Sequence, residues 1–550
     1  MNLLKYNKLQ FISRYQFCST NIHFSDNIYA IASGNVKAGV SIIRISGSNC
    51  LQAGQMLVQN AQQRQLIKGM NNSQVQDYLN LKNRYAHFKK LYSLIDPTVS
   101  PQNQSFQKQD LIYQQIDQGI FMYFQGPKSY TGEDIVEMHI HGSRALQKKV
   151  LLELSQLNNF RLADPGEFTK RAMINNKLDL LEVEGLADLL NSETESQRVQ
   201  STQQFLGKSS QILEDWRFQL IRALAHAEAF IDFESDQDDV EFNILGKTQE
   251  NVQQVIKDIN EQLSDRNRGE ILRDGMKISI IGKPNAGKST LLNCLAKKDI
   301  AIVSEIPGTT RDALSVSLNI SGFPILLYDT AGIRQTKDVI EEKGVNKALQ
   351  NIQVLKQIIK LKLQFGKIKR QHARESDLNI WIIDIDDVIK QADGSYIVQD
   401  IKEISEILES NQNTLIFINK IDKVNSQKEI TDITIRDKKF KIDGQISAQH
   451  NQNINSLLDK LTKKINERLD ITDGIMSSGT ISIITQTRHR LELQKCLEHL
   501  EIFSRNKQNL PVDIVCEELR QAVNCIGRIT GRVDVEEVLD VLFSEFCIGK

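Results

Sequence analysis

Four short motifs in the chain carry residue types and spacings that suit a guanine nucleotide. The first, GKPNAGKS (282–289), fits the pattern GxxxxGK[ST], follows the apolar run KISII and precedes the helical run STLLNCLA. Its glycines allow a tight turn in which N–H groups face phosphates, and the following helix N-terminus adds partial positive charge. Lys288 then reaches the β- and γ-phosphates, while the Ser289 hydroxyl is placed for Mg²⁺.

The second and third motifs complete the metal and phosphate contacts. GTTRD (308–312) offers Thr310 as a second Mg²⁺ ligand. DTAG (329–332) ends an apolar strand-like run, so Asp329 can hold the metal through water and the Gly332 N–H can contact the γ-phosphate.

The fourth motif, NKID (419–422), selects the base. Asp422 can accept hydrogen bonds from the guanine N1–H and 2-amino groups, a donor pair that adenine lacks, and such a site rejects the wrong base strongly. ISAQ (446–449) is the expected final guanine loop. The motifs predict GTP binding by Asn285, Ala286, Gly287, Lys288, Ser289, Thr290, Thr310, Asp329, Gly332, Asn419, Lys420, Asp422, Ser447 and Ala448.

The residue after DTAG is Ile333, where small signalling GTPases carry a glutamine that orients the attacking water. Hydrolysis must therefore be organised by another group. Glu341 and Glu342 lie just downstream in IEEKG and are candidate carboxylates. The alternative for either residue is an exposed acid at the start of a helix.

The motifs lie in a stretch where apolar strands such as KISII, LNIWIID and TLIFI alternate with helical runs. This alternation predicts a parallel sheet with helices on both faces. Helical periodicity covers 177–265 and 485–545, and the two segments can pack as one helical domain. The fold class is multidomain α/β, with five predicted parts: a targeting segment (1–25), an α+β N-terminal domain (26–175), a first helical segment (176–272), an inserted Ras-like P-loop GTPase domain (273–472) and a second helical segment (473–550).

Length and composition are those of a globular protein with two to four domains. The chain has 550 residues, of which 40% are hydrophobic and 25% charged, and its net charge of −1 gives no global sign of a nucleic-acid binder. No apolar run approaches the length of a membrane span. The seven cysteines lack CxxC pairs, which disfavours a zinc site and a disulfide scaffold.

Three segments differ from their surroundings. Residues 1–25 are basic, contain serine and have no acid, which favours a mitochondrial targeting segment over a plain disordered tail. Residues 352–373 are rich in Lys and Ile; a partner-binding helix is one interpretation, and we favour an insertion without assigned function. The chain ends in FCIGK, where Gly549 and Lys550 break the prenylation pattern after Cys547. Two interpretations remain for this C-terminal segment: it is the end of a helix without a function of its own, or it places Cys547 at a functional site.

Several stretches besides the nucleotide motifs resemble the MnmE or TrmE family of tRNA-modification GTPases. They are IIRISG (42–47), GPKSYTGEDIVEMHIHG (126–142), DPGEFTKRAMINNKLDLLEVEGLADLL (164–190) and the terminal FCIGK. The resemblance covers the chain from Asp26 onward, except about 50–118 and 352–373. It implies a folate-binding N-terminal domain, a helical domain made of two segments and an inserted GTPase domain. One departure is SGNVKAGV (33–40), where family members carry a glycine-rich loop.

The resemblance also implies roles for single residues. Glu341 matches a carboxylate that helps to orient water, and Cys547 matches a cysteine required for tRNA modification but not for GTP hydrolysis. For His139 and His141 we favour a structural or folate-site role over a metal. The positions that match folate contacts are Arg44, Glu137, Lys177 and Lys550. The positions that match a K⁺ site are Asn285, Ser304, Ile306 and Thr309, of which Ser304 and Thr309 also join the predicted GTP site.

The reaction that the resemblance implies is GTP hydrolysis coupled to modification of the wobble uridine of tRNA. Family members are homodimers that work with an FAD-dependent MnmG/GidA-like partner in a heterotetramer, using a tetrahydrofolate one-carbon unit (5-formyl or 5,10-methylene), Mg²⁺ and K⁺. They place a carboxymethylaminomethyl or taurinomethyl group at C5. With the targeting segment, this predicts the mitochondrial matrix. The alternatives are a ribosome-assembly GTPase without modifying activity and a paralogue that has lost folate binding.

Overall fold

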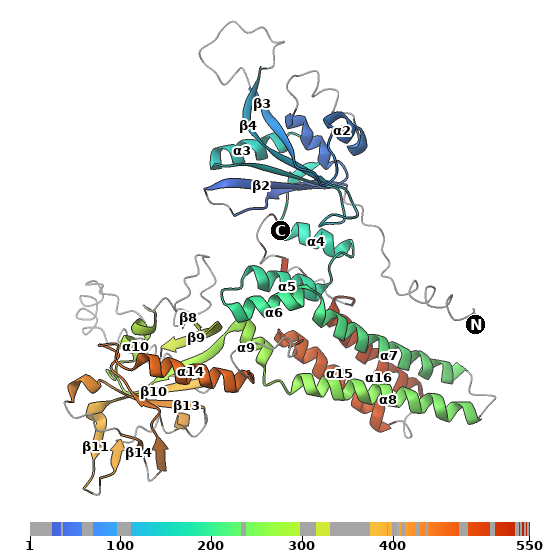
Figure 1. The fold of residues 1–550 in the computed structure, drawn as a ribbon. Coiled ribbons are helices and arrows are strands. Elements are labelled where there is room, and N and C mark those ends of the chain that lie inside the picture. Colours follow the sequence, from blue (N-terminus) through green and yellow to red (C-terminus); the bar gives the residue numbers. More distant parts are fainter. Residues whose placement is uncertain are drawn as a thin grey trace, which may run out of the picture. The chain divides into compact units, whose positions relative to one another are not determined.

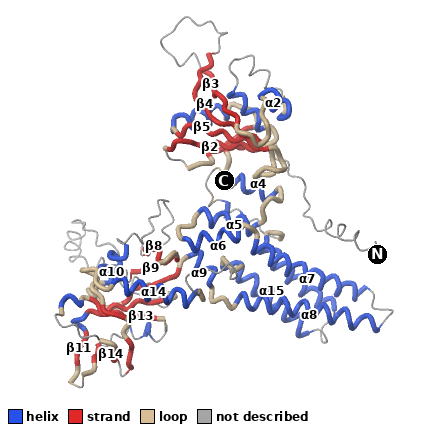
Figure 2. Tube along the Cα trace, in the orientation of Figure 1, coloured by secondary structure: helices blue, strands red, loops and turns tan. Residues whose placement is uncertain are grey.

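The computed structural model divides into two compact units. Unit 1 comprises Met1–Ala187, Phe205–Ile221 and Arg520–Lys550, and unit 2 comprises Asp188–Gln204 and Arg222–Leu519. Each unit contains helices and strands (Figures 1 and 2). The residues that the structure describes are 25–34, 37–57, 70–95, 112–232, 238–296, 315–329, 375–392, 394–398, 404, 406–408, 413–424, 430–435, 438–471, 482–506, 512–533, 538–539, 542–543, 546 and 549.

Unit 1 contains a six-stranded sheet with the order β3-β4-β5-β2-β1-β6. Side chains alternate across a strand, and in β5 (Ile135–Gly142) this alternation separates buried Val136, Met138 and Ile140 from polar residues on the other face. The remaining strands are β1 (Asn27–Ile31), β2 (Ala38–Ser46), β3 (His87–Ile95), β4 (Ile112–Phe124) and β6 (Phe160–Leu162).

The apolar face of this sheet packs on η1 (Cys50–Leu57), α2 (Asn72–Leu79) and α3 (Arg144–Leu154) to form the main core of the domain. On the opposite face, Phe168 of α4 (Glu167–Ile174) covers Ile28 and Ala30 in a smaller cluster. The rest of that face carries the polar side chains of β2 and β5, which is where a ligand could reach the sheet.

The segment predicted as helical between 177 and 265 contains four helices. The first, α5 (Leu180–Leu190), begins with a capping box in which the Asp179 and Glu182 side chains each accept the other residue's backbone N–H, at 2.8 and 2.9 Å. In unit 2, α8 and α15 lie side by side (Figure 1). The other helices are α6 (Glu195–Phe205), α7 (Lys208–Asp232), α8 (Asp238–Leu263), α9 (Arg268–Asp274), α15 (Thr487–Asn506) and α16 (Val512–Thr530).

Unit 2 contains the predicted α/β domain. Its six-stranded sheet has the order β16-β13-β10-β7-β9-β8, and all neighbours are parallel except β8 and β9. The helix α14 (Ile454–Leu469) buries Ile454, Leu457, Leu461 and Ile465, whose spacing of three or four residues makes one apolar face. The other elements are β7 (Met276–Ile281), α10 (Lys288–Leu295), β8 (Ser315–Ile320), β9 (Phe323–Asp329), β10 (Leu378–Asp384), β13 (Thr414–Asn419) and β16 (Gly444–Gln445).

A second, four-stranded sheet in unit 2 does not follow from the sequence patterns. Its order is β11-β12-β14-β15, and it packs on the main sheet through Val398, Ile433 and Ile435. Its strands are β11 (Val388–Lys390), β12 (Tyr396–Val398), β14 (Asp432–Ile435) and β15 (Lys438–Lys441), with η4 (Ile385–Asp387) and η5 (Ile421–Lys423) nearby in the chain. Of the helices that the structure describes, none has the length and apolar character of a membrane span.

Candidate functional site

The loop between β7 and α10 has the backbone shape that phosphate binding needs. Gly282, Asn285 and Gly287 have positive φ angles of 147°, 65° and 98°, and Gly287 is the N-cap of α10. Lys288 is buried, and its Nζ donates hydrogen bonds to the carbonyl oxygens of Gly282 (2.8 Å) and Lys283 (2.6 Å). The ammonium is therefore held inside the loop at a helix N-terminus, an arrangement that suits phosphate. Ser289 and Thr290 follow in the first turn of α10.

Asn419 connects the first nucleotide motif to the last. It is buried at the end of β13, donates through Nδ2 to the Ala286 carbonyl at 2.8 Å and accepts the Ala448 N–H at 3.0 Å. A side chain on Gly287 would place its Cβ 2.1 Å from Asn419 Nδ2, so this close approach requires glycine. The predicted GTP-binding residues at the two ends of the domain are thus brought together, with Asn419 as a positioning residue.

Asp422 is fixed as a hydrogen-bond acceptor. Ser447 Oγ donates to its Oδ1 at 2.5 Å, and this hydrogen bond lowers the pKa of the Asp422 carboxyl. Its Oδ2 lies 3.8 Å from His450 Nε2. The carboxylate is therefore ionised at neutral pH, as an acceptor for guanine N–H groups must be.

Two acidic residues that the motifs did not predict hold the nucleotide loops from the end of β10. Asp384 Oδ2 accepts a hydrogen bond from Lys420 Nζ at 2.6 Å, and Asp387 Oδ1 accepts one from Lys283 Nζ at 2.8 Å. Burial acts to raise the pKa of Asp384, but hydrogen bonds from Lys420 and the Asp386 N–H, together with the charges of Lys420 and Lys423, outweigh it and the pKa is lowered. These two residues could have been predicted from DIDD, which directly follows the strand LNIWII. The carboxyl ends of parallel strands carry the binding loops, so acids at this position are candidate site residues.

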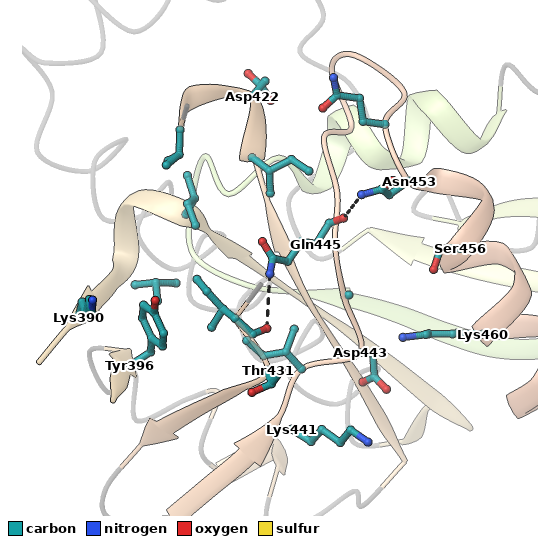
Figure 3. A pocket seen from close by; sticks show the side chains of 18 residues that line it. Lys390, Tyr396, Asp422, Thr431, Lys441, Asp443, Gln445, Asn453, Ser456 and Lys460 are labelled. Atoms are coloured by element: carbon teal, nitrogen blue, oxygen red, sulfur yellow. Dashed lines mark hydrogen bonds between the residues drawn. The ribbon is translucent and has the colours of Figure 1, made fainter. Parts of the chain in front are cut away.

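A cavity of about 1270 Å³ adjoins the guanine end of this site. Figure 3 shows it between the four-stranded sheet, β16 and the start of α14, with Asp422 at one side. Lys390, Lys441 and Lys460 lie around its rim, and Asn453 Nδ2 donates to the Gln445 carbonyl at 2.9 Å. The cavity therefore extends away from the phosphate end of the nucleotide site.

Part of the predicted nucleotide site cannot be placed. Asp329 is the last residue of β9, as the motif predicted. Among the described residues, no group of three or more His, Cys, Asp or Glu side chains could hold a metal ion. The predicted residues that lie outside the described residues are Ser304, Ile306, Thr309, Thr310, Gly332, Glu341, Cys547 and Lys550.

A second site lies on the N-terminal sheet, on what we call the polar face, formed by Arg44, Glu137 and His139. Arg44 on β2 is directly opposite Glu137 on β5, and Arg44 Nε lies 2.9 Å from Glu137 Oε1. The Arg44 guanidinium also lies 5.3 Å from the ring centroid of Tyr130 and 5.8 Å from that of Phe168. The side chains of Arg44 and Glu137 are each less than a fifth exposed. A guanidinium and a carboxylate therefore lie together on a surface that is largely shielded from water.

Lys177, the third predicted folate contact, lies on the turn after α4. Its Nζ donates to the Pro127 carbonyl at 3.1 Å, and Asn175 Nδ2 donates to the Thr131 carbonyl at 2.6 Å. The turn is therefore attached to the loop 126–134. No contact joins Lys177 to the Arg44–Glu137 pair among the described side chains, so the structure brings together two of the three predicted folate residues that it describes.

A buried ion network fixes α4 to this sheet. Arg171 is fully buried and lies within 3.2 Å of carboxylate oxygens of Asp26, Glu133 and Glu167. Arg161 also binds Glu167, at 2.6 Å. Burial acts to raise the pKa values of Asp26 and Glu167, but hydrogen bonds from the two arginines outweigh it and both are lowered. The sequence reasoning missed this network; an acid and an arginine four residues apart in EFTKRA were its only local signal.

The end of the chain packs against the same domain. Phe543 and Phe546 are buried in a cluster with α5, and a Cβ on Gly166 would lie 2.9 Å from the Phe543 ring. Gly549 has a φ of 103°, and a Cβ there would lie 2.2 Å from the Ile31 carbonyl oxygen. Gly549 therefore lies directly against the end of β1, where only glycine can approach the backbone so closely.

Comparison with known proteins covers nearly the whole chain. Residues 27–177 match the family model for the GTP-binding protein TrmE N-terminus, and residues 180–547 match that for the MnmE helical domain. A mitochondrial 5-taurinomethyluridine-[tRNA] synthase subunit GTPB3 from Danio rerio is 35% identical, over 96% of this chain and 93% of its own.

Bacterial relatives are equally similar. The tRNA modification GTPase MnmE of Wolbachia sp. subsp. Brugia malayi and that of Agrobacterium fabrum are each 35% identical, over 96% of this chain and 99% of their own. Among solved structures, the G domain of the T. maritima FeoB iron transporter is 18% identical over 35% of this chain and 98% of its own, with a TM-score of 0.20. The resemblance read from the motifs is confirmed: this chain belongs to the MnmE/TrmE family of tRNA modification GTPases.

Proposed function

We propose that this protein hydrolyses GTP and, with an FAD-dependent partner, installs an aminomethyl-type group at C5 of the wobble uridine of tRNA. The one-carbon unit comes from a tetrahydrofolate derivative bound on the polar face. The relatives support this proposal, since the Danio rerio protein is named for taurinomethyluridine synthesis and the bacterial ones for tRNA modification.

The position of Gly549 is the observation that carries the proposal. It contacts Ile31, and the adjoining Ala30 is opposite Arg44, which in turn is opposite Glu137. Two residues of extended chain reach at most about 7 Å. A tail anchored at Gly549 can therefore deliver Cys547 to the polar face, a placement that a ribosome-assembly GTPase would not need.

At the folate site, we assign complementary roles to the charged residues. The Glu137 carboxylate, held by Arg44, accepts N–H groups from the amine edge of the pterin, and Lys177 and Lys550 attract the anionic glutamyl tail. Cys547 takes part in the modification chemistry and not in GTP hydrolysis.

At the GTPase site, the hydroxyl groups of Ser289 and Thr310 suit Mg²⁺, a cation that prefers oxygen ligands. Asn285, Ser304, Ile306 and Thr309 would hold K⁺, which would supply positive charge beside the phosphates in place of an arginine finger. Glu341 would orient the attacking water. Replacing K⁺ by Na⁺ at constant ionic strength should therefore lower the GTP hydrolysis rate of the purified protein.

We further propose a homodimer that joins a flavoprotein partner and acts on mitochondrial tRNA. The basic, acid-free residues 1–25 support import, and one relative is a mitochondrial protein. Exposed apolar side chains at Phe88 and Ile120, which are paired on β3 and β4, leave a surface on the sheet that a second copy could cover.

The test is mass spectrometry of wobble nucleosides from mitochondrial tRNA in cells depleted of this protein. We expect the C5-aminomethyl group to be lost and to return with the wild-type chain but not with Cys547→Ser. GTP hydrolysis by purified Cys547→Ser should equal that of wild type. An unchanged nucleoside profile after depletion would refute the modifying function and leave the assembly GTPase.

A further inference from the structure

The proposed function assigns no role to His139, the third residue of the polar face. His139 lies on β5 two residues from Glu137, so both side chains leave the same face of the strand. The register places Ile42 of β2 and Ile120 of β4 on either side of His139. The imidazole therefore has apolar neighbours across the sheet and the Glu137 carboxylate along the strand.

His139 Nε2 is buried and makes no hydrogen bond. It lies 3.7 Å from Glu137 Oε2, beyond the usual limit of about 3.2 Å for a hydrogen bond, while Glu137 Oε1 is bound by Arg44. Buried polar atoms without a partner are uncommon, and each one needs an explanation. Here an imidazole nitrogen and a carboxylate oxygen face each other across a gap slightly too wide for a hydrogen bond.

We propose that His139 positions the Glu137 carboxylate for the ligand of the polar face. A small rotation of either side chain closes the gap, so that His139 Nε2–H donates to Oε2 while Arg44 holds Oε1. Each carboxylate oxygen keeps a lone pair, and the two lone pairs then face one ligand edge. Such a carboxylate suits an edge with two adjacent N–H donors, which the reduced pterin of a folate carries. The inference rests on the proposed folate site.

The charged groups around His139 support this assignment. Glu137 and Arg44 are the partners described above. Further along β5, His141 Nδ1 lies 2.7 Å from Asp117 Oδ1. His141 shares the strand and the face with His139, but its side chain is 69% exposed. It therefore provides a matched control, because its removal changes the same face without touching Glu137.

The experiment is isothermal titration of 5-formyltetrahydrofolate into the full-length protein, comparing wild type with His139→Leu, His139→Gln, His141→Leu and Glu137→Gln. Loss of one charge-assisted hydrogen bond should weaken binding about tenfold in His139→Leu. His139→Gln should remain within about threefold of wild type, because its amide N–H can still donate to the carboxylate. His141→Leu should match wild type, and thermal unfolding checks that each variant is folded.

Equal losses in His139→Leu and His139→Gln would overturn the inference, because they would show that the ring only fills space. It would also be overturned if Glu137→Gln lost binding while His139→Leu kept it, an outcome that leaves the folate site intact. If wild type did not bind the folate, or if Glu137→Gln bound it normally, the proposed folate site would fail and the inference with it.

Discussion

Substitution of Gly549 by alanine tests whether the tail must dock on β1. Gly549 has a φ of 103°, and an added Cβ would lie 2.2 Å from the Ile31 oxygen and 3.0 Å from Ala32 Cα. Both contacts are with backbone, so no side chain can move aside to relieve them. The left-handed conformation alone costs an alanine roughly 1–2 kcal/mol, and the overlap adds to this. The ratio of docked to undocked tail should fall by at least about 5- to 30-fold.

The assay measures the two activities separately. Cells depleted of the protein are rescued with Gly549→Ala, and the C5-modified wobble nucleoside is quantified by mass spectrometry. We expect a large loss of modified nucleoside and a GTP hydrolysis rate within about twofold of wild type, because the nucleotide site contains no tail residue. Limited proteolysis of the C-terminal segment should become faster, since the segment no longer docks on β1.

Gly39→Ala is the matched control, because Gly39 is an exposed glycine of the same domain with no atom within 4 Å of an added Cβ. It should rescue like wild type. The reasoning fails if Gly549→Ala restores full modification, or if modification is lost while proteolysis of the C-terminal segment stays unchanged.

Three other perturbations test the ion network and the base contact. Arg171→Leu leaves buried carboxylates without their cation and should lower the free energy of unfolding of the N-terminal domain by about 3–5 kcal/mol, measured by urea denaturation. As a control, Arg198→Leu removes only an exposed ion pair and should leave the unfolding midpoint unchanged. Because the folded-state pKa values of Asp26 and Glu167 are lowered, their contribution is present above about pH 4 and should be lost as the pH falls further, a decline that Arg171→Leu should largely abolish. Asp422→Asn removes the acceptor of two guanine hydrogen bonds and should weaken GTP binding roughly 100-fold or more in a fluorescent-nucleotide titration; binding as tight as wild type would show that another group selects the base.

The sequence predicted best those features that are set within a few consecutive residues. The loop 282–289 could be recognised because a glycine turn, a lysine and a hydroxyl must follow one another between a strand and a helix. The parallel sheet followed from the alternation of buried strands and helical runs, and its observed order agrees with that class.

Features that depend on distant segments could not be predicted in the same way. Arg171 donates hydrogen bonds to Asp26 and Glu133, which lie 145 and 38 residues away in the sequence. No local sequence pattern predicts contacts over such separations. The four-stranded sheet was missed because its strands are only three or four residues long and follow no sustained alternation. Glu137 and His139 are two residues apart in the sequence, but only the fold shows that an imidazole nitrogen is left without a hydrogen bond beside the carboxylate.

Two glycine contacts constrain where the C-terminal segment can lie. Gly166, in the PGEF segment, meets Phe543 and Phe546, and Gly549 meets the backbone of Ile31. Each contact excludes a Cβ, so the two glycines limit where Phe543, Phe546 and Gly549 can lie. The proposed role of Cys547 depends on the second contact, because Cys547 is two residues from Gly549 and two residues of extended chain reach at most about 7 Å. In the proposed reaction, docking at Gly549 would therefore keep the Cys547 thiol near the end of β1.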